Sequence, residues 1–119
     1  GYQPVDALDF DPEAIRVART NARRNGVSGR IRFRLQDLTR LPRPSRRKYS
    51  LICANLLADL LSAERLRLVN RLGADGVLVA AGVLKSEFSR VQHAFESAGL
   101  RLVATGVQEE WRSGAFSWR

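Results

Sequence analysis

The sequence has a single cysteine, no methionine and no long apolar run. Cys53 alone excludes an internal disulfide framework, and its apolar neighbours favour a buried, small hydrophobic side chain. No apolar run approaches membrane-spanning length. The first twenty residues carry several acids, a composition unlike that of a signal peptide or an arginine-rich transit peptide. We therefore expect a cytoplasmic protein with no membrane partner.

Lysine is scarce, although the chain is strongly basic. Lys48 and Lys85 are the only lysines among 20 basic residues, so arginine supplies almost all of the formal net charge of +8. Such a field favours acidic partners. The arginines are scattered and no nucleic-acid-binding motif accompanies them, so a nucleic-acid partner is a weaker prediction than a protein substrate. No Cys/His cluster suggests a metal site, and the pattern indicates no oligomeric state.

The first half of the chain alternates strand and helix signals. We predict a strand over residues 5–9, followed by a helix that begins at Asp11-Pro12 and ends at Asn25-Gly26. Apolar and basic residues then alternate from Ile31 to Leu35, which predicts a half-buried strand. After a basic, proline-containing loop, residues 51–54 form an apolar run that predicts a strand buried on both faces.

The second half continues the alternation and then changes. We predict a leucine-rich helix over residues 56–72, a turn at Asp75-Gly76 and a buried strand over residues 77–81. Ser86 can cap a further helix that ends at Gly99. Residues 102–107 and 115–118 are expected to pair as a terminal hairpin. His93 is expected at the surface, and the Glu109-Glu110-Trp111 cluster is given no catalytic role.

This order is typical of a Rossmann-like α/β fold, with a doubly wound, mostly parallel sheet and a C-terminal antiparallel hairpin. Ligands of such sheets bind beyond the carboxyl ends of the strands. Asp9, Asp37 and Asn55 each follow a predicted strand, so we expect them to converge on one crevice. Two structural alternatives stay open: Asp9 and Asp11 could cap the first helix, and Asn55 could cap a helix that begins near Leu56.

The segment ALDFDPEAIRVARTNARRNGV resembles the second strand and following helix of the class I S-adenosylmethionine-dependent methyltransferases. The resemblance implies that Asp9 holds the cofactor ribose and that Phe10 packs against adenine. It also implies that Asp37, in FRLQDL, lies near the adenine amino group, with Leu38 among the cofactor-binding residues. S-adenosylmethionine is therefore the expected cofactor.

Three later segments narrow the resemblance. Asn55, in ICANLLADLL, resembles the asparagine of the VANIL-type motif in methyltransferases that modify the ribosomal protein L11. AGVLKSEFSRVQHAFESAGL and EEWRSGAFSWR resemble two further segments of that family, in the same order and at similar spacings. The resemblance covers essentially all 119 residues. It implies methyl transfer to a lysine side chain or N-terminal amine of a ribosomal protein, with Asn55 as the catalytic residue that orients the amine.

The family's glycine-rich cofactor loop has no counterpart in this sequence. That loop, of the form DxGxGxG, ends the family's first strand, and GYQPVDALD cannot supply it. We therefore expect residues 1–119 to form a single, partial catalytic domain that lacks the first strand and glycine loop and is incomplete alone as an enzyme. The missing strand would lie between residues 5–9 and residues 51–54. We also expect residues 1–119 to lack the family's amino-terminal substrate-recognition domain.

Two other functions remain open. An RNA or DNA methyltransferase is one, but Leu56-Leu57 after Asn55 departs from the NPPY-like motif, whose aromatic residue stacks on a flipped base. That departure favours a protein acceptor. The other is a noncatalytic basic fragment of a methyltransferase.

Overall fold

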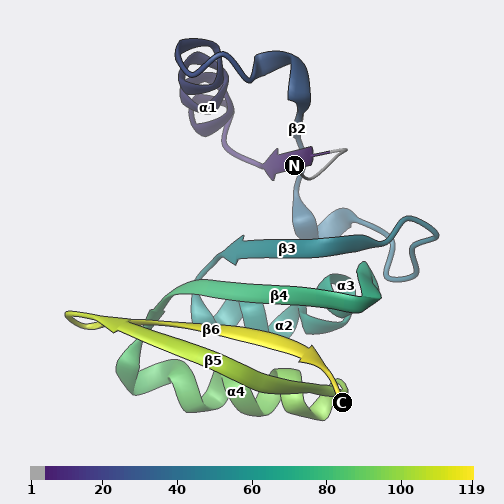
Figure 1. Ribbon diagram of the computed structural model, residues 1–119, viewed down its shortest axis with the longest axis vertical. Coiled ribbons are helices and arrows are strands. Elements are labelled where there is room, and N and C mark those ends of the chain that lie inside the picture. The colour runs from purple at the N-terminus through teal and green to yellow at the C-terminus, as the bar shows by residue number, and fades with distance from the viewer. Residues whose placement is uncertain (1–4) are drawn as a thin grey trace. The chain divides into compact units, whose positions relative to one another are not determined.

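The computed structural model describes residues 5–119, and these residues divide into two compact units between Leu41 and Pro42 (Figure 1). The segment in which we expect no glycine loop includes residues 1–4, which lie outside the described residues. Among residues 5–119, no helix has both the length and the apolar character needed to cross a membrane. Helices and strands alternate in the predicted order, which confirms the α/β class.

The first unit is a two-stranded parallel sheet with one long helix. Strand β1 (Val5–Asp9) pairs with β2 (Ile31–Leu35), and helix α1 (Pro12–Arg24) connects them. Two short 3-10 turns, η1 (Ser28–Arg30) and η2 (Leu38–Arg40), precede and follow β2. The alternation predicted for β2 holds at its start, but Leu35 is 58% exposed. Its predicted burial is wrong, because Leu35 stands at the end of the ladder, opposite Asp9.

Helix α1 begins and ends where the sequence predicts. The Asp11 carboxylate accepts a hydrogen bond from the Glu13 backbone N–H, which satisfies one donor of the first turn, and Pro12 occupies the first helical position. Gly26 follows the C-terminal end with φ of 69°. The apolar face buries Ile15 and Ala22.

The second unit is a four-stranded mixed sheet. Strands β3 (Tyr49–Asn55), β4 (Leu72–Leu84), β5 (Leu100–Gln108) and β6 (Trp111–Trp118) lie in the order β3-β4-β6-β5. The β3–β4 pair is parallel, whereas β4–β6 and β5–β6 are antiparallel. The parallel pairs β1–β2 and β3–β4, together with the terminal β5–β6 hairpin, confirm the predicted architecture.

The core of the second unit lies between this sheet and its helices. Helices α2 (Ala58–Ala63), α3 (Arg65–Val69) and α4 (Phe88–Ser97) cover one face of the sheet (Figure 1), and the 3-10 turn η3 (Lys85–Glu87) leads into α4. Phe88, Phe95 and Phe116 are fully buried there, and the Phe95 and Phe116 ring centroids are 5.1 Å apart. An aromatic cluster therefore joins α4 to β6.

The predicted helix over residues 56–72 is wrong in extent. It is two short helices separated at Glu64, and the chain is already in β4 at Leu72. The ladder begins earlier than the apolar run, because Tyr49 N–H donates to Arg71 O at 2.7 Å and Leu72 pairs with Tyr49. The predicted turn at residues 75–76 is instead part of an irregular stretch of β4, where the β3–β4 register shifts.

Two smaller predictions are also wrong. Cys53 is exposed, and only Ala54 of β3 is buried, because alternate residues of this strand point away from the face that carries the helices. The predicted burial of β3 on both faces is therefore not observed in the second unit. Ser86 lies within η3, and α4 begins after Glu87 without a side-chain cap.

Candidate functional site

The first unit places two of the predicted site residues at the same end of its sheet. Asp9 ends β1 and pairs with Leu35, the last residue of β2, and the Gln36 N–H continues the ladder with a 2.8 Å bond to Asp9 O. Asp37 follows one residue later. Because the strands are parallel, Asp9 and Asp37 both lie beyond the carboxyl end of this sheet, as predicted. Asn55 belongs to the second unit.

The carboxylate of Asp9 is half-buried and is held in place from one side. Its Oδ1 accepts the Asp11 backbone N–H at 3.0 Å, while Asp11 itself caps α1. The capping alternative is therefore correct for Asp11, whereas Asp9 fixes the turn that leads into the helix. A carboxylate offers about four acceptor positions, so this bond leaves capacity for a ligand hydroxyl. Phe10, next in the chain, is 72% exposed and presents its ring to solvent.

Asp37 is engaged more fully within its own loop. Its Oδ1 accepts hydrogen bonds from the Thr39 backbone N–H at 2.9 Å and from Thr39 Oγ1 at 2.7 Å. Arg40 Nε lies 3.9 Å from its Oδ2. Asp37 therefore caps the η2 turn, in which Leu38 is the first, half-buried residue. Asp37 can therefore hold the shape of this loop around a ligand. Fewer acceptor positions of its carboxylate are available to that ligand than at Asp9.

Asn55 is the last residue of β3 and is exposed. The alternative that it caps the following helix is wrong. Helix α2 begins only at Ala58, its N-cap position is Leu57, and no side chain caps it. Among the residues that the structure describes, no hydrogen bond joins the Asn55 side chain to a partner. The amide at the carboxyl end of β3 is therefore free to meet a ligand.

Gly82 lies against the Asn55 side chain, a contact that was not predicted from the sequence. It has φ of 75°, and a Cβ built on it would lie 2.3 Å from Asn55 Oδ1. The Asn55 side chain therefore rests against the bare Cα of Gly82, on the neighbouring strand. The AGVLK segment carried a signal, because a glycine inside an apolar strand often marks a close approach.

A cavity of about 350 Å³ lies beside this pair, at the same end of the sheet. Small residues of adjacent strands line part of this cavity, and one of them, Ala81, pairs with Asn55 in the β3–β4 register. We call it the hairpin cavity. The residues that line it come from β4 and from the β5–β6 hairpin: Ala81, Gly82, Gly106, Val107, Gln108, Trp111, Arg112 and Ser113.

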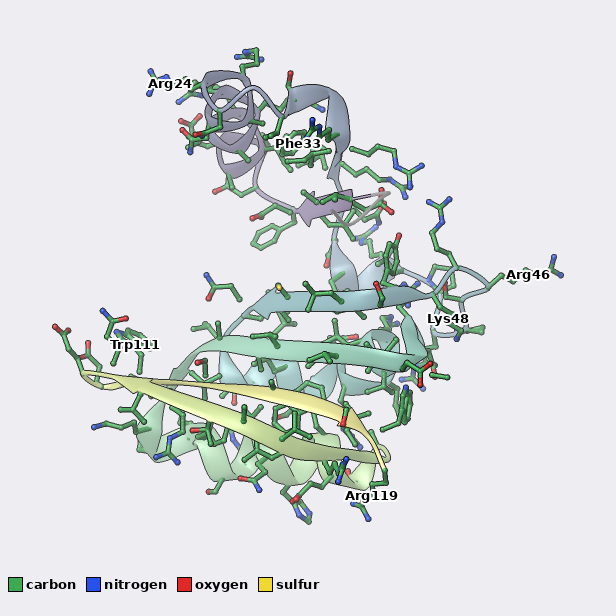
Figure 2. All side chains as sticks on the ribbon, in the orientation of Figure 1. Arg24, Phe33, Arg46, Lys48, Trp111 and Arg119 are labelled. Atoms are coloured by element: carbon green, nitrogen blue, oxygen red, sulfur yellow. The ribbon has the colours of Figure 1, made fainter. Side chains whose placement is uncertain are left out.

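Two larger side chains form the wall of the hairpin cavity. Trp111, labelled in Figure 2, is 42% exposed and begins β6 directly after the hairpin turn, where Glu109 has φ of 56°. The Arg112 guanidinium stacks 5.5 Å above the Phe88 ring, and its Nε is buried without a hydrogen-bond partner among the described residues. Trp111 supplies an apolar wall and Arg112 an unsatisfied donor.

The described residues offer little for other kinds of chemistry. Among residues 5–119, no three His, Cys, Asp or Glu side chains gather in a way that could hold a metal ion. His93 lies on α4 and is exposed, as predicted. The first unit offers the carboxylates of Asp9 and Asp37 and the exposed Phe10 ring at the carboxyl end of its sheet. The second unit offers the Asn55 amide near a small cavity at the carboxyl end of β3.

Sequence comparison finds one matching family model. The model described as ribosomal protein L11 methyltransferase (PrmA) matches residues 1–117. A curated relative of the same name from Pelotomaculum thermopropionicum is 36% identical over 111 residues, which cover 93% of this chain and 35% of the relative. The chain thus spans about a third of the length of that relative.

Structural comparison gives the same fold. A ribosomal protein L11 methylase from Lactobacillus delbrueckii subsp. bulgaricus superimposes with a TM-score of 0.88 at 24% identity, over 100% of this chain and 60% of that one. A TehB-like SAM-dependent methyltransferase from Corynebacterium glutamicum gives 0.71 at 22% identity, over 97% of this chain and 68% of that one. The Rossmann-like fold predicted from the sequence is thereby confirmed.

Proposed function

Because the chain belongs to the ribosomal protein L11 methyltransferase family, whose model matches residues 1–117, we propose that it contributes to S-adenosylmethionine-dependent methylation of ribosomal protein L11. The methyl acceptor is a protein amine, either a lysine side chain or an N-terminal amine. The names of the curated relatives support this substrate. This chain covers only about a third of the length of those relatives. The activity is therefore proposed for the longer protein.

Asp9 and Phe10 are the residues of this chain that best fit the cofactor. The half-buried Asp9 carboxylate keeps acceptor capacity after its bond to the Asp11 N–H, so it can accept hydrogen bonds from both ribose hydroxyls. The exposed Phe10 ring can pack against adenine. Asp37 and Leu38 fit a supporting role, because Asp37 is already committed to Thr39. When bound, the cofactor supplies an electrophilic methyl group on sulfur.

Asn55 is the residue proposed to act on the acceptor. An amine attacks only through a neutral lone pair, whereas a free lysine amine has a pKa of about 10.4 and an α-amine about 7.7 to 8.0. The Asn55 amide oxygen can accept an N–H of the neutral amine and so direct its lone pair toward the methyl group. Asn55 is thus an orienting residue, and no residue of this chain is assigned the role of a general base.

The contact between Asn55 and Gly82 is the observation that carries this proposal. Gly82 leaves the space that the Asn55 amide oxygen occupies, and the oxygen has no competing hydrogen bond among the described residues. Beside it, the hairpin cavity offers small lining residues and the Trp111 ring. This combination suits an aliphatic stem that ends in an amine.

The first test is calorimetry with S-adenosylmethionine, on this chain and on a longer chain that has the full length of the relatives. We expect binding by the longer chain, weakened by Asp9→Asn. The second test measures methylation of purified ribosomal protein L11 by the longer chain, with and without Asn55→Ala. We expect a loss of kcat of about 10²-fold with cofactor affinity unchanged, as for other lost transition-state hydrogen bonds. Full turnover by Asn55→Ala would exclude the orienting role.

The competing functions predict other outcomes of the same tests. An RNA or DNA methyltransferase would leave ribosomal protein L11 unmodified but transfer the methyl group to nucleic acid. A noncatalytic basic fragment would bind no cofactor in either length. Absence of cofactor binding by both chains would therefore overturn the enzyme proposal.

A further inference from the structure

A strongly basic loop opens the second unit. We call residues 42–48, between the unit boundary and β3, the basic loop. Four of its seven residues are cationic, and all four are exposed: Arg43, Arg46, Arg47 and Lys48. No acidic residue occurs between Asp37 and Asp59 in the sequence. The loop therefore carries positive charge with no carboxylate of its own.

The backbone of the basic loop is fixed by side chains that follow α3. Arg71 Nη2 donates to Pro42 O at 2.7 Å, and Asn70 Nδ2 donates to Arg43 O at 2.9 Å. The Lys48 ammonium donates in turn to Asn70 O. Two prolines restrict the loop further. The loop is thus a shaped surface tied to the end of α3, which lowers the entropy lost when a ligand orders it.

Arg71, which donates to Pro42 O, places one more cation next to the loop. Burial lowers the pKa of Arg71, Tyr49 opposes this shift, and the charge of Arg67 adds to it. Glu64, which precedes α3, forms an ion pair with Arg67. The exposed guanidinium groups of Arg43 and Arg46 have no ion pair with an acidic residue in the part of the chain that the structure describes. Their charge is available to an external anion.

The basic loop lies far from the proposed acceptor site within the second unit. Figure 2 shows Arg46 and Lys48 at one end of the four-stranded sheet and Trp111 at the other. The loop precedes β3, whereas Asn55 ends that strand. A ligand on the basic loop would therefore leave the hairpin cavity open.

From this arrangement we propose that the basic loop binds the phosphate backbone of nucleic acid. Guanidinium groups match phosphate oxygens in bidentate geometry, and interfaces with nucleic acid are more polar and more positive than those between proteins. The loop fits that description, because no large exposed hydrophobic side chain occurs between residues 36 and 56 of the described chain. An acidic protein partner would instead call for an apolar centre surrounded by charge. The inference does not depend on the proposed methyl transfer.

The test compares two double variants that remove the same charge from different places. Arg43→Gln/Arg46→Gln alters the basic loop, and Arg19→Gln/Arg24→Gln alters the exposed arginines of α1. Binding of a fluorescently labelled 20-nucleotide RNA to the longer chain, of the length of the relatives, is followed by anisotropy at several salt concentrations. Loss of two phosphate contacts reduces the slope of log K against log salt by about 2. We expect that change and about tenfold weaker binding for the loop variant, and less than a twofold effect for the α1 variant.

Three outcomes would overturn the proposal: no RNA binding by the wild-type chain, equal losses in both double variants, or equally tight binding of a labelled polyglutamate peptide of equal charge.

Unfolding curves establish that each variant is folded. If the glutamine pair unfolds, Arg43→Lys/Arg46→Lys replaces it, because that pair keeps the charge and loses the bidentate geometry. We expect the lysine pair to keep the salt slope and to bind about threefold more weakly, as a point charge does. If the lysine pair bound with the affinity and the salt slope of the wild-type chain, charge alone would explain the binding. That result would overturn the proposed bidentate contacts between guanidinium and phosphate groups.

Discussion

The amide oxygen of Asn55 occupies the place where a side chain on Gly82 would begin. A Cβ on Gly82 would lie 2.3 Å from Asn55 Oδ1, and the φ of 75° at Gly82 is one that residues with a Cβ rarely adopt. The end of the Asn55 side chain thus lies against the backbone of the neighbouring parallel strand, at the carboxyl ends of both strands. The orientation proposed for the acceptor amine depends on this contact.

Gly82→Ala in the longer chain tests that dependence. We expect the variant to lose roughly 1 to 2 kcal/mol of unfolding free energy from the positive φ. Because Asn55 Oδ1 is the end of a flexible side chain, the clash itself is relieved by rotation of Asn55, at the cost of turnover. Chemical denaturation measures the first effect, and methylation of ribosomal protein L11 measures the second.

Gly26→Ala is the matched control for Gly82→Ala. Gly26 has a similar φ of 69°, but a Cβ there would meet nothing within 4 Å. It should show a comparable loss of stability with turnover retained. Retention of turnover by both variants would show that the position of Asn55 does not govern the reaction.

Asp9 and Asp11 lie two residues apart, and the structure predicts different effects for their variants. Asp11→Ala removes the N-cap bond to the Glu13 N–H, so we expect a loss of about 1 kcal/mol and faster hydrogen exchange in the first turn of α1. Asp9→Asn keeps an amide oxygen that can accept the Asp11 N–H. That variant should leave α1 intact but weaken cofactor binding by the longer chain about ten- to a hundredfold. Equal cofactor affinity would reduce Asp9 to a role in the turn.

The sequence predicted the local features that depend on a few neighbouring residues. The cap at Asp11, the end of α1 at Gly26 and the β5–β6 hairpin follow from short-range chemistry, and all three are observed. The helix over residues 56–72 was wrong, because leucine spacing does not reveal a break at Glu64. Nor does it reveal that Leu72 already pairs with Tyr49. Pairing with a distant strand overrides the local pattern there.

The candidate site likewise has features that could be predicted from neighbouring residues and features that could not. Asp9, Asp37 and Asn55 could be selected because each was predicted to follow a strand; in the structure Asp9 and Asn55 are the last residues of β1 and β3, and Asp37 lies two residues after β2. The hydrogen bonds that distinguish them could not be predicted: Asp37 is committed to Thr39, whereas Asp9 keeps acceptor capacity. The role of Gly82 was not visible either, since it depends on a contact with Asn55 across the β3–β4 pair.

The pair formed by Glu13 and Arg16 in α1 gives a prediction that depends on pH. Its hydrogen bond to Arg16 holds the pKa of the Glu13 carboxyl below the ordinary value of 4.5. A lowered pKa in the folded chain means that the pair stabilises the fold above the unfolded pKa, and that this contribution is lost as the pH falls through the folded pKa. An NMR titration should find the Glu13 midpoint below its ordinary value, and Arg16→Gln should return it there. An unchanged midpoint in Arg16→Gln would contradict the assigned cause.

Gly114 and Gly106 lie on neighbouring strands of the terminal hairpin. Replacing each by alanine compares a glycine with close neighbours with one that has room for a side chain. A Cβ on Gly114 would lie 2.6 Å from the ring of Phe88, which is buried in the core that joins α4 to the sheet, and 3.0 Å from the half-buried Leu102. Overpacking of this kind typically costs about 1 to 3 kcal/mol. The Arg112 guanidinium, stacked on the same ring, should move as well. We therefore expect Gly114→Ala to lower the unfolding midpoint and to disturb the hairpin cavity.

Gly106→Ala provides the comparison, because its Cβ would meet only Ser113 Oγ, at 3.4 Å. On a strand, alanine also restricts the unfolded chain more than glycine does, so this variant should be neutral or more stable by a few tenths of a kcal/mol. Denaturation of the two variants, side by side, measures the difference. If Gly114→Ala unfolded at the same midpoint as Gly106→Ala, the Phe88 ring would have room to shift. The close packing of α4 against β6 would then not be what holds the cavity wall in place.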